Sequence, residues 1–242
     1  MNVPDKATIA GAVRNGVEKA LQIQQPTVDA HIARMRRSRP DAPPTELITS
    51  LEKQFLASVS AIGAASGGAA AVPGAGTVIA IGLTAFEIGG VIEATALFAL
   101  AVAEVHGVKV VDLERRRTLV TAIVFGEGAA GFVEKAAGRA GKYWGRNLVR
   151  AIPMSAINDI NKRVFPRFIT KWGTKQGMLV LGREIPFGIG AGIGAAGNFL
   201  VGRGSVQAAR RAFGPAPANW PGLPPASGRL LWPDARLSSV GY

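Results

Sequence analysis

Side chains that could carry out chemistry are scarce in this chain of 242 residues. It contains no cysteine, which excludes disulfides, thiolate metal sites and cysteine nucleophiles. The only histidines, His31 and His106, leave too little material for a multi-histidine metal site or a histidine-based triad. We therefore predict a non-enzymatic protein that needs no cofactor.

Glu93, Glu104 and His106 come closest to a metal-binding set. On one helix the two glutamates share a face, but their offset of 11 residues puts them about 16 Å apart along the axis. His106 points about 160° away from Glu104 on an ideal helix. One metal ion cannot reach all three side chains. We interpret them as a polar stripe on a partly exposed helix and predict no metal site.

Glu87 lies on a different, apolar face of the same segment, together with Leu83 and Val91. A carboxylate in such a place needs a proton or a cation. We favour a buried ion pair with Arg183 or Arg203 that fixes how two helices pack. The alternatives are a general acid, which no second catalytic group supports, and a solvent-exposed carboxylate.

Gly192–Gly197 matches the dinucleotide-binding fingerprint letter by letter. That motif requires a preceding strand and an acidic residue about twenty positions later. No acid occurs between Glu184 and Asp234. We therefore reject a nucleotide site.

The glycines of this region instead predict a flat helix surface that allows close backbone approach. Each glycine lowers helix stability by about 1 kcal/mol, so a partner surface must compensate. That partner is either the Ser66–Ala80 region or a second copy of the chain, which makes self-association a candidate property. The predicted helix-packing residues are Gly188, Gly190, Gly192 and Gly194.

Positive charge is the most prominent functional signal. The net charge is +12, and residues 135–183 hold eleven Lys and Arg against one acid, Asp159. On a continuous helix to about Arg150, the first five of these cations would lie within about 80° of one face. The predicted anion-binding residues are Lys135, Arg139, Lys142, Arg146, Arg150, Arg163, Arg167, Lys171 and Lys175.

Aromatic side chains are interleaved with these cations, namely Tyr143, Trp144, Phe165, Phe168 and Trp172. Cations beside amphipathic aromatics suit a surface that rests on anionic lipid headgroups. The alternative is a solvated basic face whose aromatic residues belong to the core. Nucleic acid is the least favoured partner, because no recognised reader motif accompanies the charge.

An apolar helical hairpin is the element around which the rest is organised. Residues 54–86 carry no charge over 33 positions. Ala71–Thr77 interrupt this stretch with a proline and glycines that form turns. We expect one helix from a cap at Thr45 to this turn, and a second from Thr77 to about His106.

The second arm of the hairpin is long enough to cross a membrane, which takes about 20 apolar residues. Glu87 and Glu93 lie within it, and each would oppose insertion by roughly 2.5–3.5 kcal/mol if charged. We therefore expect a hairpin buried in protein, with a transmembrane hairpin as the alternative.

Shorter elements flank the hairpin. We expect an amphipathic helix over residues 5–22 and a basic, proline-containing connector from there to Pro44. After Gly107, a helix capped by Asp112 runs to about Phe125, and another continues to about Arg150. Short helices follow to about residue 183, and a glycine-rich helix runs from Pro186 to Phe213.

Several of these segments resemble the EcsC protein family: the Ala70–Thr77 turn, Leu97–Gly107, Arg167–Gly182 and Ile185–Phe213. The resemblance covers about residues 45–214. It implies an α-helical, membrane-associated protein. The family's biochemical role is not established, so the resemblance transfers no catalytic residues.

These features predict an all-α fold, a multi-helix bundle around the central hairpin with a glycine-rich C-terminal helix. The predicted divisions are an N-terminal helix and connector (1–44), a helical domain (45–214) and a proline-rich flexible tail (215–242). No secretory signal is visible, so we expect a cytoplasmic protein that associates peripherally with the inner membrane face or a membrane complex. The alternative is a soluble, self-associating structural or interaction protein.

Overall fold

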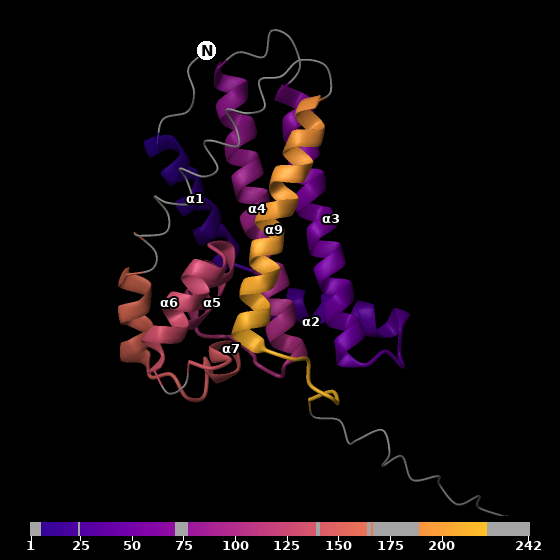
Figure 1. Cartoon of the computed structure of the whole chain (residues 1–242), viewed down its shortest axis with the longest axis vertical. Coiled ribbons are helices and arrows are strands. Elements are labelled where there is room, and N and C mark those ends of the chain that lie inside the picture. The colour runs from indigo at the N-terminus through magenta and orange to yellow at the C-terminus, as the bar shows by residue number, and fades with distance from the viewer. Residues whose placement is uncertain are drawn as a thin grey trace, which may run out of the picture.

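The computed structural model describes residues 6–23, 25–70, 77–138, 141–163, 166 and 189–221 (Figure 1). Every regular element within these ranges is helical, which confirms the predicted all-α bundle. A further helix covers residues 154–163. The named helices are α1 (Lys6–Leu21), α2 (Gln25–Ser38), α3 (Pro44–Ala70), α4 (Thr77–Val105), α5 (Leu113–Val124), α6 (Glu127–Ala136), α7 (Trp144–Asn147) and α9 (Ile189–Phe213).

The hairpin of α3 and α4 forms the centre of the bundle, and α9 lies alongside it (Figure 1). Helix α4 is apolar on all sides because α1, α2, α3, α5 and α9 all pack against it. Within the described ranges, Ala85–Val105 is the one segment long and apolar enough to cross a membrane, and 67% of it is buried in the protein. The turn at 71–76 lies outside the described residues.

The closest helix contact joins α3 to α9 at Gly63 and Gly194. A Cβ atom on either residue would overlap the other's backbone carbonyl. Asn198 lies one turn further along α9 and Gly202 lies two turns further, and both face α3. Gly202 contacts Leu56 and Val59. The absence of side chains at the three glycines allows the two backbones to approach.

The predicted connector between residues 26 and 44 is wrong over most of its length, because α2 occupies Gln25–Ser38. Pro26 lies in the first turn, where a missing N–H removes no helical hydrogen bond. Val28, Ile32 and Met35 recur at helical spacing and are buried in the main core. The basic residues that suggested a connector occupy the remaining faces of this helix.

The start of α3 also differs by two residues from the prediction. The helix begins at Pro44, and the carbonyl of Pro43 accepts the first hydrogen bonds, from the amides of Glu46 and Leu47. Thr45 is therefore a helical residue rather than the cap. The predicted cap at Asp112 is confirmed, since its side chain accepts from the Arg115 amide.

The predicted continuous helix to Arg150 is wrong. Helix α6 ends at Ala136, and α7 begins only at Trp144. Between them Gly138 has a φ of 57° and Tyr143 a φ of 55°, both in the left-handed region that a helix cannot contain. The five cations from Lys135 to Arg150 therefore do not share one helical face.

Helix α1 packs on α4 and α5 through a second apolar cluster that includes Val13, Val17, Ile92 and Val120. At the other end of the described chain, Trp220 lies under the Arg36 guanidinium and donates to the Ala42 carbonyl. Segments on both sides of residues 45–214 thus contact the bundle.

Candidate anion-binding surface

Six described cations lie between residues 135 and 163, and none of them has a carboxylate partner among the residues that the structure describes. All but Arg146 are exposed, and Arg146 is half-buried. We call this set the basic flank, and its segment lies at the lower left of Figure 1 around α6, α7 and the 154–163 helix. The basic flank consists of Lys135, Lys142, Arg146, Arg150, Lys162 and Arg163.

Five other described cations contrast with the basic flank, because carboxylates of the same chain neutralise them. Arg210 and Arg211 bind Glu52 and Glu134 through contacts of 2.6 and 2.5 Å. The remaining ion pairs within the described ranges are Lys19 with Glu93, Lys109 with Asp29 and Glu104, and Arg117 with Glu18 and Glu114. The paired carboxylates thus bind cations outside the basic flank, and this includes Glu134, which lies on α6 next to Lys135.

Buried side chains hold the loop that carries the basic flank. Trp144, Leu148 and Ile152 are buried in the main core, so α7 and the turn after it are anchored by apolar contact. Arg115, at the start of α5, donates through one Nη1 to the carbonyls of Leu148 and Ile152. This contact fixes the 148–152 turn to the N-terminal end of α5.

Exposed apolar side chains lie on the two segments that Arg115 joins. Val149 and Met154 are 40% and 36% exposed, and they flank Arg150 in sequence. Val111 and Leu113, at the start of α5, are 72% and 52% exposed. Exposed apolar groups interspersed with unpaired cations are typical of a surface that meets a bilayer interface.

Sequence reasoning missed these four apolar side chains. The sequence signal was present, because each is a large aliphatic residue next to a charged or helix-capping position. Their exposure depends on where α5 and the 148–152 turn emerge from the bundle, which the periodicity of either segment does not specify.

Some of the predicted anion-binding residues and aromatics belong to the described residues, and the others lie outside them. Lys135, Lys142, Arg146, Arg150 and Arg163 belong to the basic flank, whereas Arg139, Arg167, Lys171 and Lys175 lie outside the described residues. Of the aromatic residues, Trp144 is a core residue, as the alternative interpretation held. Tyr143 is half-buried, with Lys142 and Arg146 over its ring. Phe165, Phe168 and Trp172 lie outside the described residues.

Glu87 is a buried carboxylate, 5% exposed, and the alternative of simple solvent exposure is wrong. Ser66, on α3, donates a hydrogen bond of 2.8 Å to its Oε2. Of the two cations proposed as its partners, Arg183 lies outside the described residues and Arg203 is exposed on α9. Glu87 therefore contributes a polar link between the two arms of the hairpin.

The predicted helix-packing glycines differ in their surroundings. Gly194 packs against Gly63 and Gly67 of α3, so part of the predicted partner region is correct. Gly192 is exposed, and a Cβ there would meet nothing within 4 Å. Gly190 lies in the first turn of α9, and Gly188 lies outside the described residues.

Glu93, Glu104 and His106 each have a separate partner. Glu93 binds Lys19, and Glu104 accepts from Gln25 and pairs with Lys109. Burial raises the pKa of Glu104 and lowers the pKa of His106. Nδ1 of His106 lies 2.8 Å from the Val102 carbonyl. Nε2 lies 3.3 Å from the Pro215 carbonyl. A carbonyl only accepts, so the shorter contact favours the proton on Nδ1 in the neutral ring.

No protein-family model, curated protein or solved structure matches this chain. The resemblance to the EcsC family therefore stays a prediction from the segments that carry it. What the chain does has to be inferred from the basic flank and the apolar side chains beside it.

Proposed function

We propose that this is a non-enzymatic protein that associates peripherally with an anionic membrane surface, the cytoplasmic face or a complex embedded in it, through the basic flank. The observation that supports this most is the combination found there. Residues 135–163 carry six cations to which the described residues offer no carboxylate partner, and Val149 and Met154, close to Arg150 in sequence, are exposed. The resemblance to the EcsC family implies the same association.

The physical chemistry of the basic flank suits this role. Each Lys or Arg close to an anionic leaflet contributes about 1 kcal/mol, and the attraction decays within a Debye length. Exposed valine and methionine side chains add a short-range apolar term when they enter the interface. The cations thus supply attraction over distance, and the aliphatic groups favour contact.

Flotation with liposomes tests the proposal. The purified protein should float with vesicles that contain anionic phospholipid and should remain at the bottom with purely zwitterionic vesicles. Equal flotation with both, or with neither, would contradict the proposal.

A matched pair of charge reversals locates the contact. Arg150→Glu with Arg163→Glu removes two cations of the basic flank, and we expect vesicle affinity to fall at least about tenfold. Arg14→Glu with Lys53→Glu changes the net charge equally on exposed residues of α1 and α3. This control should reduce affinity less than the first pair. Equal loss from both pairs would mean that net charge, not the basic flank, drives binding.

A soluble, self-associating protein is the second candidate, and one observation favours it. Phe86 on α4 and Phe199 and Leu200 on α9 are exposed, Leu200 by 67%. A second copy of the chain could cover such side chains. If this candidate is correct, a sample that fails to float should contain an oligomer when its mass is measured by light scattering. Leu200→Lys should lower that mass. A monomeric wild-type protein would exclude this candidate.

A further inference from the structure

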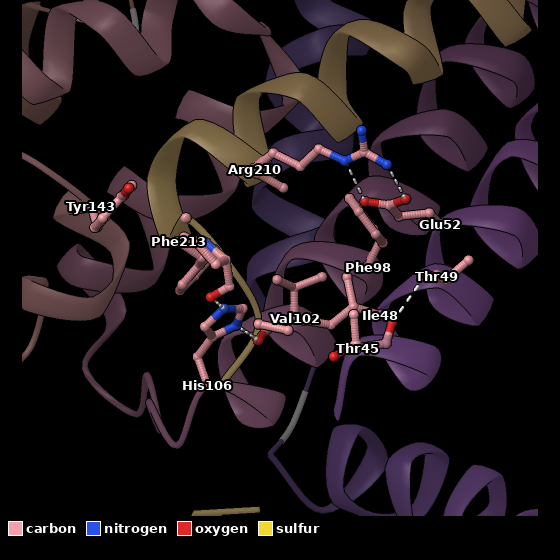
Figure 2. Close-up of a pocket in the computed structure, with 14 residues that line it drawn as sticks. Thr45, Ile48, Thr49, Glu52, Phe98, Val102, His106, Tyr143, Arg210 and Phe213 are labelled. Carbon is pink, nitrogen blue, oxygen red and sulfur yellow. Dashed lines mark hydrogen bonds and ion pairs between the residues drawn. The ribbon is translucent and has the colours of Figure 1, made fainter. Parts of the chain in front are cut away.

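A cavity of about 430 Å³ lies between the start of α3 and the C-terminal ends of α4 and α9 (Figure 2). Helix α3 lines it with residues at spacings of three and four, from Thr45 to Glu52. Tyr143 lines it from the loop that precedes α7. Its volume is within the range of pockets that hold small ligands.

The wall of the cavity is largely apolar. Ile48, Phe98, Val102, Ala209 and Phe213 line it from three helices. Phe213 also stacks on the His106 ring, with centroids 5.0 Å apart. Such a wall favours a ligand with an apolar body, because removing the apolar surfaces of ligand and wall from water is favourable.

Charge is balanced at one end of the cavity. Glu52 and Arg210 form a two-pronged ion pair with contacts of 2.8 and 2.6 Å (Figure 2). Each of these charges already has its counterion, so this end attracts neither an anion nor a cation strongly.

At the opposite end Tyr143 lines the cavity, and two cations lie over its ring although neither of them is a lining residue. His106 is there, and burial keeps its pKa low, so the ring adds no charge at neutral pH. Lys142 Nζ and Arg146 Cζ lie 5.5 and 5.2 Å from the Tyr143 ring centroid. Arg146 also donates to the Pro215 carbonyl, and neither cation has a carboxylate partner within the described residues. The surroundings of Tyr143 are therefore more positive than the Glu52 end of the cavity, where the charges are paired.

We propose that this cavity binds a small anionic amphiphile. Its apolar body would lie against Phe98, Val102 and Phe213, and its acidic group would lie at the Tyr143 end beside Lys142. The shared chemistry is one phosphate or carboxylate on an apolar chain. This binding involves a single molecule in solution and does not depend on association with a membrane.

Titration calorimetry with soluble probes tests the ligand class. Octyl phosphate should bind with one-to-one stoichiometry, at least about tenfold more tightly than glycerol 3-phosphate, because only the octyl chain can cover the apolar wall. This result identifies a lipid-like source, whereas equal binding of the two phosphates would overturn the requirement for an apolar body.

Octyltrimethylammonium should bind at least about tenfold more weakly than octyl phosphate, since the mouth repels its charge. Equal affinity for both octyl probes, or no binding of either, would overturn the proposal.

Two tryptophan substitutions on α3 locate the site. Thr49 and Ser58 are both exposed, and each hydroxyl donates to the carbonyl four residues earlier, at 3.0 and 2.9 Å. Thr49 lines the cavity, whereas Ser58 is not among its lining residues. Thr49→Trp should weaken octyl phosphate binding at least about tenfold by filling the cavity, and Ser58→Trp should leave it unchanged. Equal effects of both substitutions would place the probe elsewhere.

A charge substitution provides a second test that does not fill the cavity. Lys142→Glu should weaken octyl phosphate binding about tenfold, because it places a negative charge at the mouth. Unchanged affinity would overturn the assignment of the acidic group to this end. Thr49→Trp should leave flotation with anionic vesicles intact, and the Arg150→Glu and Arg163→Glu pair should leave octyl phosphate binding intact. Failure of one proposal is thus separable from failure of the other.

Discussion

At the scale of single residues, two glycines of the same helix have opposite surroundings. Gly194 faces the backbone of Gly63 across the α3–α9 contact, whereas Gly192 faces open space. Each glycine lowers the helix propensity of α9 by the same amount. The structure compensates for that loss only at Gly194, where a side chain would separate the two helices.

Alanine substitution should therefore have opposite effects at these positions. Gly194→Ala should lower the free energy of unfolding by about 1–3 kcal/mol, since α3 has to move away from the new methyl group. Gly192→Ala should raise it by about 0.5–1 kcal/mol, because alanine restricts the unfolded chain and favours the helix. Urea denaturation of both variants measures the two values. A loss of stability in Gly192→Ala would show that α9 has a further contact there.

His106 predicts how stability depends on pH. Burial is the main cause that lowers its pKa below the ordinary 6.5, and the nearby Arg146 guanidinium acts in the same direction. The unfolded chain then binds a proton more readily than the folded one. The contribution of the neutral His106 to the free energy of unfolding is fully present above about pH 6.5, and it is lost as the pH drops toward the pKa of the folded state.

Substituting glutamine for His106 should flatten this part of the pH profile. We expect the free energy of unfolding of His106→Gln to change less than that of the wild type between about pH 5 and pH 7. His31, whose pKa is also lowered by burial, leaves part of the slope in place. The raised pKa of Glu104 makes the free energy of unfolding fall as the pH rises above the ordinary pKa of 4.5, which is the opposite direction. Glu104 is present in both proteins, so its effect cancels in the comparison. Superimposable profiles from urea titrations would contradict this role of His106.

At the scale of elements, two consecutive arginines attach α5 to its surroundings in different ways. Arg116 is buried and donates to the carbonyls of Leu21, Ile23 and Val110, thereby binding the C-terminal end of α1 to the approach of α5. Burial lowers its pKa. Arg117 forms partly exposed ion pairs with Glu18 and Glu114.

Replacing each arginine by methionine should separate these roles. Arg116→Met leaves three carbonyls without their donor, and we expect a loss of about 2–4 kcal/mol in the free energy of unfolding. Arg117→Met should cost less than about 1 kcal/mol, as partly exposed ion pairs do. Thermal and urea unfolding measure both. Equal losses would mean that the α1 junction is held by its apolar cluster rather than by Arg116.

At the scale of the whole molecule, charge is distributed unequally over the bundle. Acidic residues on α1, α3, α4 and α6 neutralise cations of neighbouring elements, whereas the described residues offer the basic flank no carboxylate partner. The net charge of +12 is thus partly concentrated on one part of the surface. Such a distribution orients the protein toward an anionic surface before contact.

Salt dependence should report this distribution. Vesicle affinity should fall steeply as sodium chloride rises from about 0.05 to 0.5 M, because the Debye length shortens from about 14 to 4 Å. The slope should be shallower for the Arg150→Glu and Arg163→Glu pair than for the wild type. Flotation or surface plasmon resonance at several salt concentrations provides the measurement. Binding that is insensitive to salt would indicate insertion of apolar helices instead.

Much of the secondary structure could be predicted from the sequence. Asp112, Gly107 and Gly214 mark helix ends through backbone and capping preferences that act within one turn. The apolar period of α3 and α5 indicates helices for the same reason. These signals are local, so they do not depend on which surfaces meet.

Other features required the tertiary structure. The end of α6 follows from left-handed backbone at Gly138 and Tyr143, although tyrosine has no strong preference for that conformation. Which glycine of α9 packs depends on where α3 crosses it. Which cations remain unpaired depends on acids far away in sequence, such as Glu52 with Arg210. The sequence by itself thus determined most of the helices, though not α2 or the break after α6, and the excess of positive charge. Only the packing of the helices decided where that charge stays uncompensated, because pairing and burial are set by residues that come together in space.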